Sequence, residues 1–151
     1  MGYLRVLNAL IERYQNTIIN LFGAHTHKDS LVYATQFNNL DKVVAITHVG
    51  PSLTTYTKLN PSFRVFEVDN DTNQLVDYTQ YRINLEESNK TGEAKWEVAY
   101  TFKDLYKVPD MGRDSLVQIF NKLRSGDRDT QKIYIQNHYT FWDPIDQLSE
   151  S

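Results

Sequence analysis

The first twenty residues have the hydrophobic spacing of an amphipathic helix. Apolar side chains recur every three or four positions between residues 3 and 20, so a helix would gather them on one face. The apolar stripe consists of Tyr3, Leu7, Leu10, Ile11, Tyr14 and Ile18. Leu21 and Phe22 follow. The pattern predicts a helix over 3–20 that leads into a short buried strand.

From residue 30 to residue 102 the period changes to that of β-strands. The run from Val43 to Val49 is almost continuously apolar, as expected for a central strand. The alternation from Trp96 to Phe102 is typical of a strand with one buried face. Further strands are predicted at 31–37, 63–68 and 75–85, with a hairpin turn at 70–73. This stretch predicts about five mostly antiparallel strands.

The helical period returns after residue 103. One short helix is predicted around 116–123, with Asp114 or Ser115 as its N-terminal cap. A last helix is predicted around 133–141 and would stop before Asp143-Pro144. The order of helix, strands and helices predicts an α+β fold with no internal domain boundary.

Composition and charge exclude several classes of protein. The chain has 151 residues, a formal net charge of −3 and no basic patch, so we expect no nucleic-acid partner. It has no cysteine, which excludes disulfides, thiolate metal sites and a cysteine nucleophile. No apolar stretch is long enough to cross a membrane. Arg5, Glu12 and Arg13 interrupt the first apolar run, so the chain shows no signal peptide.

The segment Gly23-Ala-His-Thr-His-Lys-Asp29 holds the candidate chemistry. His25 and His27 are two positions apart, and on an extended backbone their side chains would point to the same side. Neutral imidazole is the commonest metal ligand among side chains. The pair is therefore predicted to bind one metal ion or two adjacent ones. Two histidines do not complete a site, because a catalytic zinc normally takes three protein ligands and a water.

Several further segments accompany the histidine segment: Arg13 to Thr17 leading into it, Pro-Ser-x-Thr-Thr-Tyr at Pro51 to Tyr56, Asn-Pro-x-aromatic-Arg-Val at Asn60 to Val65, Tyr81 to Leu85, Trp96-Glu97, and Tyr139 to Trp142. Together these segments resemble the acid sphingomyelinase-like phosphodiesterases, a branch of the calcineurin-like metallophosphoesterases. A lone His-x-His is a weak signal, whereas the string from Pro51 to Val65 is much more specific. The resemblance extends over residues 3–142.

This resemblance implies a fold, a reaction and a metal. Residues 1–102 would be the C-terminal portion of a metallophosphoesterase β-sandwich, and 103–151 a small helical subdomain of the same structural unit. His25 and His27 would each bind a zinc ion of a two-metal centre, and Tyr56 would lie close to the substrate. The reaction would be hydrolysis of a phosphodiester, either a sphingomyelin-like phospholipid or a nucleotide derivative. Two metals clamp the phosphate and activate a water for attack.

The chain also departs from the family pattern. The earlier ligand motifs Asp-x-His, Gly-Asp-x-x-Asp and Gly-Asn-His are absent, so no catalytic residue is assigned and we expect the chain to be inactive alone. Its expected partner is the missing N-terminal catalytic portion or a homologue, and self-association would be a second way to cover an open face. Ala24 stands where the family has glycine, and alanine disfavours positive φ. We therefore expect altered geometry in the histidine segment.

The family's usual compartment would be secreted or lysosomal. Two N-glycosylation sequons, at Asn70 and Asn89, fit that expectation, although such triplets also arise by chance.

Other polar residues have two interpretations each. Asp29 is either an acceptor for a metal-binding imidazole or a residue that starts a strand. Tyr56 either lines a pocket or packs on the core. His48 is interpreted as a packed strand residue rather than a metal ligand, and His138 as a packing or surface residue of the last helix.

Two other functions stay open. The chain could be a non-catalytic binding or regulatory module derived from the same family. It could also be a small metal-binding protein that uses His25, His27 and a ligand from a second copy.

Overall fold

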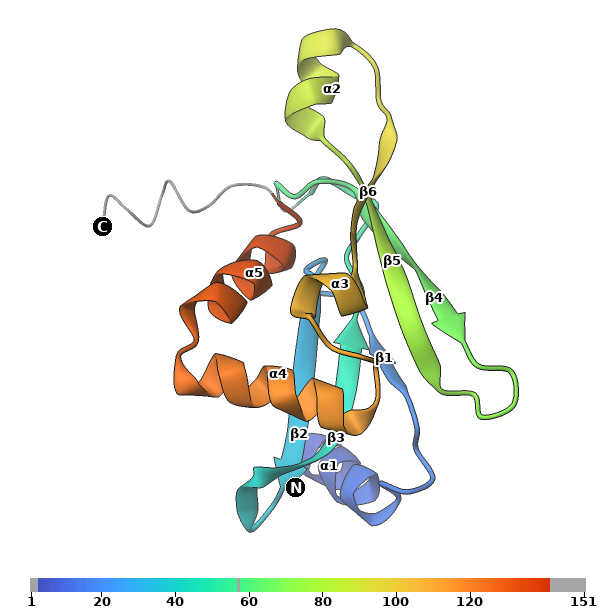
Figure 1. Ribbon diagram of the computed structural model, residues 1–151, viewed down its shortest axis with the longest axis vertical. Helices are drawn as coiled ribbons and strands as arrows, with labels where there is room; N and C mark the ends of the chain where they lie inside the picture. Colours follow the sequence, from blue (N-terminus) through green and yellow to red (C-terminus); the bar gives the residue numbers. More distant parts are fainter. Residues whose placement is uncertain (1–2, 57, 142–151) are drawn as a thin grey trace.

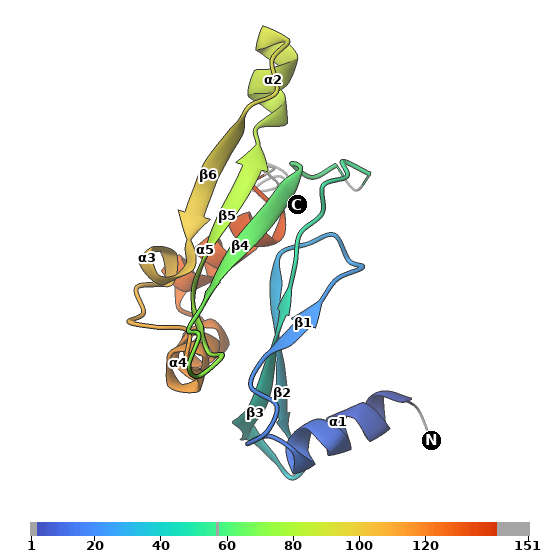
Figure 2. The same ribbon diagram turned by 90° about the vertical axis from the view of Figure 1, so that its right-hand side faces the viewer.

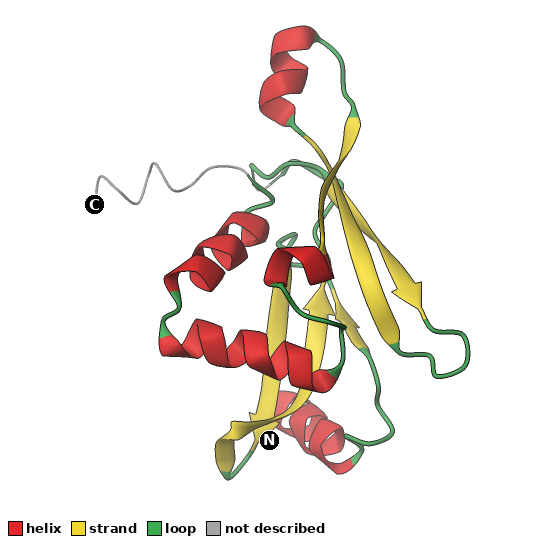
Figure 3. Ribbon diagram, viewed as in Figure 1, coloured by secondary structure: helices red, strands yellow, loops and turns green. Residues whose placement is uncertain are grey.

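A computed structural model describes residues 3–56 and 58–141 of the chain. These residues form five helices and six strands (Figures 1 and 3). In chain order the elements are α1 (Tyr3–Arg13), β1 (Leu21–Gly23), β2 (Ser30–Gln36), β3 (Asn39–Val49), β4 (Ser62–Val68), β5 (Leu75–Ile83), α2 (Leu85–Thr91), β6 (Trp96–Thr101), α3 (Phe102–Tyr106), α4 (Arg113–Ser125) and α5 (Arg128–His138). The predicted α+β class is confirmed.

The strands form two separate three-stranded sheets. The first sheet has the order β1-β3-β2, with β2 antiparallel to β3 and β1 parallel to it. The second sheet has the order β4-β5-β6 and is antiparallel throughout. The prediction of mostly antiparallel strands is therefore confirmed, and the β1–β3 pair is the exception.

The two sheets meet through aromatic side chains. The ring of Phe66 in β4 lies 5.1 Å from the ring of Phe22 in β1 and 6.2 Å from that of His48 in β3. Helix α4 packs against β3, and α5 packs against β2, so these helices close the core beside the sheets. Figure 2 shows α1 on the side of the first sheet that faces away from the second. The buried cluster includes Leu31, Ile46, Leu75, Tyr78, Tyr100, Phe102, Leu116 and Ile119.

The first helix is shorter than predicted. Helix α1 ends at Arg13, and the chain then turns, with the amide groups of Thr17 and Ile18 donating to the carbonyl of Tyr14. Asn16 and Thr17 have poor helix propensity, which explains why apolar spacing alone overestimated the length.

Two helices were not predicted. Helix α2 lies where the sequence indicated a strand end and a loop, and it buries no residue, so no hydrophobic period reveals it. Its signals are its caps: the Asn84 side chain accepts from the amide of Glu87, and Gly92 has a φ of 75°. Helix α3 begins at Phe102, where the alternation of β6 had suggested a continuing strand.

The last two helices begin earlier than predicted. Gly112, not Asp114 or Ser115, precedes the first residue of α4. The Asp127 side chain caps α5 by accepting from the amide of Thr130. The predicted stop at 143–144 lies outside the described residues.

We expect Ile119→Ala to lower the free energy of unfolding by about 2–5 kcal/mol, because Ile119 is almost fully buried in the core cluster and its truncation leaves a cavity. Gln118→Ala, on the exposed side of the same helix, should change it by less than about 0.5 kcal/mol. Urea denaturation of both variants measures the difference. Equal effects of the two substitutions would contradict the assignment of this helix face to the core.

Candidate functional site

The histidine loop, defined as residues 24–29, crosses the end of β3. Strand β1 ends with Gly23 opposite Val49, and β2 begins with Ser30 opposite the same residue. The loop must therefore pass over Val49, at the carboxyl end of the central strand. Ligands of open α/β sheets commonly bind outside the carboxyl ends of strands.

The backbone of this loop is not extended. His25 has a φ of 82° and His27 a φ of 63°, both in the left-handed region. The expectation that both rings point to the same side assumed an extended backbone, and that assumption is wrong. Histidine is among the few residues enriched in this region, and such conformations cluster at functional sites. The unusual backbone thus falls on the two residues singled out for metal binding.

The glycine and alanine before the histidines have separate roles. A Cβ at Gly23 would lie 3.2 Å from methyl groups of both Thr47 and Val49, so this position needs glycine for the close approach of β1 to β3. Ala24 is not among the described residues with positive φ. The expected conflict at Ala24 does not arise, because the left-handed conformation lies one residue later.

The two histidines differ in their surroundings. His25 is exposed, whereas His27 is partly buried, and its Nδ1 atom has no hydrogen-bond partner among the described residues. An unpartnered buried nitrogen is unfavourable, and it is also the kind of atom that a metal ion uses. The part of the chain that the structure describes holds no group of three or more metal-binding side chains. The loop thus offers two candidate ligands and no more.

Asp29 closes the loop and takes part in a buried ion pair. Its Oδ1 atom lies 2.6 Å from Nη2 of Arg64, and the exposed fractions of the two side chains are only 7% and 4%. The Nη atoms of Arg64 make no well-directed hydrogen bond within residues 3–56 and 58–141. We therefore regard the contact as mainly coulombic. Asp29 immediately precedes β2, and its carboxylate contacts the guanidinium of Arg64 and not an imidazole.

Aromatic residues complete the surroundings of this ion pair. The hydroxyl of Tyr100 donates to Oδ2 of Asp29, and the hydroxyl of Tyr78 lies 3.1 Å from that of Tyr100. The guanidinium of Arg64 lies 4.3 Å from the centre of the Tyr78 ring, and its Nε donates to Gln80. Burial, together with the Asp29 charge, raises the pKa of Tyr100 well above its ordinary value. Tyr100 therefore stays protonated and remains a donor.

His138 fastens the last helix to the same loop. Its Nδ1 atom lies 2.8 Å from the hydroxyl oxygen of Ser30 and 3.1 Å from the carbonyl oxygen of Asp29. Burial lowers the pKa of His138, partly offset by its contact with that carbonyl. The interpretation of His138 as a packing residue of the last helix agrees with this placement.

His48 lies in the interior, as interpreted from the sequence. It is 3% exposed, and its ring lies 6.3 Å from that of Phe22. Burial, and then the charge of Arg64, lower the pKa of His48 from 6.5 to about 4. His48 is therefore neutral at physiological pH.

Tyr56 is exposed on a loop. Its side chain is 85% exposed, so the interpretation that it packs on the core is wrong. Its amide donates to the hydroxyl of Thr54, in a turn that follows β3. The neighbouring Asn60 has a structural role, since its side chain donates to the carbonyl of Thr140 and accepts from the amide of Leu85. Both sequon asparagines, Asn70 and Asn89, are exposed.

Sequence reasoning missed Arg64, Tyr100 and the anchoring role of His138. Arg64 and Tyr100 were noted only as parts of a motif and of an alternating strand. No local pattern indicates that they meet Asp29 from a different sheet.

Comparison with known proteins gives a consistent result. The family model described as "Acid sphingomyelin phosphodiesterase C-terminal region" matches residues 35–145, a range that begins after the histidine loop. Sphingomyelin phosphodiesterase 2 of Caenorhabditis elegans is 32% identical over 86% of this chain and 22% of its own length. Sphingomyelin phosphodiesterase B of Dictyostelium discoideum is 33% identical over 77% of this chain and 20% of its own length.

A relative that is named for a different activity also matches. The cyclic GMP-AMP phosphodiesterase SMPDL3A of Mus musculus is 30% identical over 87% of this chain and 30% of its own length. The chain thus spans between about a sixth and a third of the length of the curated relatives it matches. None of its described helices has the length and apolar character needed to span a membrane.

We expect Asp29→Asn to lower the free energy of unfolding by about 3 kcal/mol, because it leaves the buried Arg64 cation without its counter-ion. Glu86→Gln makes the same chemical change in the exposed ion pair with Lys90 and should have little effect. Denaturant titration of both variants tests this. A small loss for Asp29→Asn would show that the buried pair does not hold the sheets together.

The buried His48 predicts a dependence of stability on pH. Its pKa is about 4 in the folded chain and should return to about 6.5 on unfolding, so the unfolded chain binds the proton more readily. This contribution to stability is constant above about pH 6.5 and declines as the pH falls towards 4, by up to about 3 kcal/mol. Unfolding free energies of the wild type and His48→Phe across this range measure it. Parallel curves for the two proteins would refute it.

Proposed function

Because this chain belongs to the family of the acid sphingomyelin phosphodiesterase C-terminal region, a phosphodiesterase family, we propose that it serves in metal-dependent hydrolysis of phosphodiester bonds. The relatives are named for a sphingolipid and a cyclic dinucleotide as substrates, so the proposed substrate is either a phospholipid headgroup or a nucleotide derivative. The observation that carries the proposal is the family match over most of the chain, joined to a histidine pair of unusual conformation beside it.

His25 and His27 are the proposed metal ligands, with zinc as the proposed metal. The orphaned Nδ1 atom of His27 supports this assignment, since a metal would supply the partner that the described residues do not. Zinc held there would supply Lewis-acid chemistry: it would stabilise negative charge on a phosphate group and lower the pKa of a bound water. The remaining ligands would come from outside the described residues, because these hold no third ligand near the pair.

This chain's own contribution is to fix the two imidazoles. Gly23 lets β1 approach β3 closely on one side of the loop, and the Asp29–Arg64 pair holds the other side. His138 adds a third attachment from α5. A loop held at both ends can keep left-handed residues in place, which is what precise ligand placement requires.

We further propose that the chain alone is inactive and needs another polypeptide segment. Val6, Leu7 and Leu10 of α1 are each about half exposed. Within the described residues β1 is an edge strand, although parallel pairs usually lie inside covered sheets. An apolar helix face and a free parallel edge support a missing N-terminal catalytic portion, or a homologue, as the partner. Self-association is the alternative way to cover them.

The proposed setting is secreted or lysosomal. Exposure of Asn70 and Asn89 supports glycosylation there, since a sequon must be accessible to be modified. One observation favours a second function, a non-catalytic binding module: the described residues alone offer no complete metal site.

We expect the 151-residue chain to bind Zn²⁺ weakly, with affinity reduced more than about tenfold in His25→Ala and in His27→Ala, because loss of a direct ligand costs at least as much as loss of an outer-shell contact. Thr26→Ala, between the two histidines, is the matched control and should bind like the wild type. Isothermal titration calorimetry measures all four proteins.

Activity separates the enzyme from the binding module. The chain alone should not hydrolyse bis(p-nitrophenyl) phosphate. Mixing the wild-type chain with the N-terminal portion of a relative should produce hydrolysis. Mixing the His27→Ala variant with the same portion should not. Zinc binding that survives both histidine substitutions would refute the metal assignment. Failure of complementation with zinc binding intact would favour the binding module.

A further inference from the structure

The end of helix α5 contacts the chain just after His27. Nδ1 of His138 lies 2.8 Å from the hydroxyl oxygen of Ser30 and 3.1 Å from the carbonyl oxygen of Asp29. A carbonyl oxygen only accepts hydrogen bonds, so the contact with Asp29 requires a proton on Nδ1. His138 therefore holds the last residue of the histidine loop and the first residue of β2.

Tyr139 contacts Lys28, the residue that follows His27. The ammonium nitrogen of Lys28 lies 4.7 Å from the centre of the Tyr139 ring, within the range of a cation–π contact. The Tyr139 ring meets the His138 ring edge-on at 5.2 Å, and Tyr134 stacks on the same imidazole at 6.0 Å. The three residues that follow the candidate ligand are thus all contacted from the end of α5.

The end of α5 is itself fixed. The side chain of Asn60 donates to the carbonyl oxygen of Thr140 at 2.9 Å, and both residues are only 4% exposed. Asn60 lies just before β4, so this bond ties the turn after α5 to the second sheet. The contacts with the loop therefore come from a rigid support, as precise ligand placement requires.

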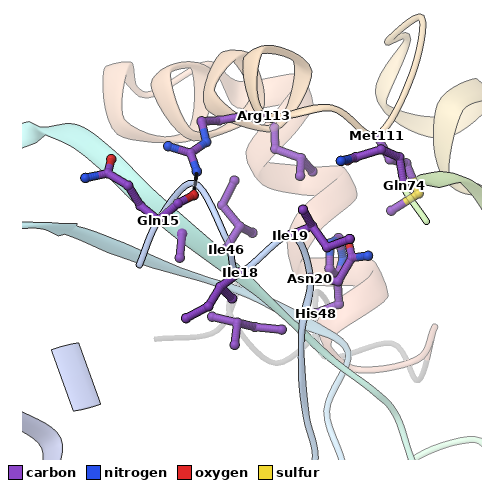
Figure 4. A pocket seen from close by; sticks show the side chains of 12 residues that line it. Gln15, Ile18, Ile19, Asn20, Ile46, His48, Gln74, Met111 and Arg113 are labelled. Carbon is purple, nitrogen blue, oxygen red and sulfur yellow. Dashed lines mark hydrogen bonds between the residues drawn. The ribbon is translucent and has the colours of Figure 1, made fainter. Parts of the chain in front are cut away.

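The entry of the loop is less tightly packed. Strand β1 pairs with β3 over only three residues, and the segment before it borders a cavity of about 210 Å³ (Figure 4). In that region an exposed bond from Nη2 of Arg113 to the carbonyl of Gln15, drawn in Figure 4, ties the segment to α4. Atoms that line a cavity lack packing partners on one side. The exit is therefore the firmer attachment of the loop.

We propose that His138 and Tyr139 are positioning residues that hold His27 in its left-handed conformation and thereby set the affinity of the loop for zinc. This inference rests on the proposed role of His25 and His27 as metal ligands. Left-handed backbone costs free energy and persists only where its surroundings hold it. Both positioning residues act through residues 28–30, since the described residues hold no group of three metal-binding side chains that includes His138.

The first test measures zinc affinity by isothermal titration calorimetry. His138→Leu should bind Zn²⁺ about fivefold more weakly than the wild type, a smaller loss than the ~10–100-fold for a group bonded directly to a ligand. His138→Asn places an amide nitrogen where Nδ1 lies and should restore most of the affinity. His138→Gln places its amide nitrogen at the position of Nε2 and should not. The Asn and Gln variants decide the matter even where His138→Leu fails to fold.

Ile133→Ala separates positioning from stability. Ile133 lies on the same helix and packs against the core, and its side chain makes no hydrogen bond to the loop. Its truncation should lower the free energy of unfolding and leave zinc affinity at the wild-type value. Equal losses of zinc affinity in Ile133→Ala and His138→Leu would overturn the proposal.

Two readouts need no metal. Nitrogen-15 spectra should place the proton of neutral His138 on Nδ1. Backbone order parameters of residues 25–28 should fall from about 0.85 towards about 0.6 in His138→Leu and His138→Gln, but not in Ile133→Ala. A proton on Nε2, or unchanged order in both His138 variants, would overturn the proposal.

These readouts also separate the proposal from the proposed function. A wild-type chain that does not bind zinc through His25 and His27 would refute the metal assignment, whereas the order of the metal-free loop would still test the positioning. Zinc binding through both histidines that no His138 variant weakens would overturn the positioning alone.

Discussion

The ion pair between Asp29 and Arg64 is the contact on which the rest of this structure depends. It joins the first residue before β2 to the inner face of the second sheet, and both side chains are almost fully buried. Charges at such depth are stable only when paired, so the two sheets cannot separate without exposing or orphaning them. Tyr100, Tyr78 and Gln80 surround the pair with further polar contacts. The interior between the sheets is therefore a polar, aromatic layer rather than a purely aliphatic one, and its partners specify a single arrangement of the sheets.

The sequence could predict the elements that pack on the core, but it could not predict the contact between Asp29 and Arg64. Hydrophobic period located the central strand and the last two helices, because each has a face that packs on the core. It also located α1, although most of the apolar face of that helix is exposed among the described residues. It missed α2, which is capped by Asn84 and Gly92 and has no buried residue. In β4 the pattern is misleading: Phe63 and Val65 face outward and are 36% and 52% exposed, while Arg64 between them faces the core. A strand fixes only which residues share a face, and the choice of inner face is made by partners distant in the chain.

The histidine segment shows the same division between local and distant information. Its residue types and spacing were enough to identify candidate ligands and a family resemblance. Its conformation was not predictable, because the left-handed backbone at His25 and His27 depends on the close β1–β3 approach at Gly23 and on the anchoring of Asp29. An isolated peptide would have no reason to hold two such residues, since each costs free energy relative to extended backbone. The loop geometry is therefore a property of the assembled sheets.

The second sheet also has an exposed apolar side. Phe63 stacks on Tyr81 and meets the edge of Trp96, which makes an aromatic cluster on the face opposite Arg64. Together with the half-exposed face of α1, this gives the chain two apolar surfaces on different sides. A self-contained domain rarely leaves both of its outer layers apolar, because exposed patches promote association. The ion pair fixes the interior, whereas these two surfaces leave apolar side chains exposed on the exterior.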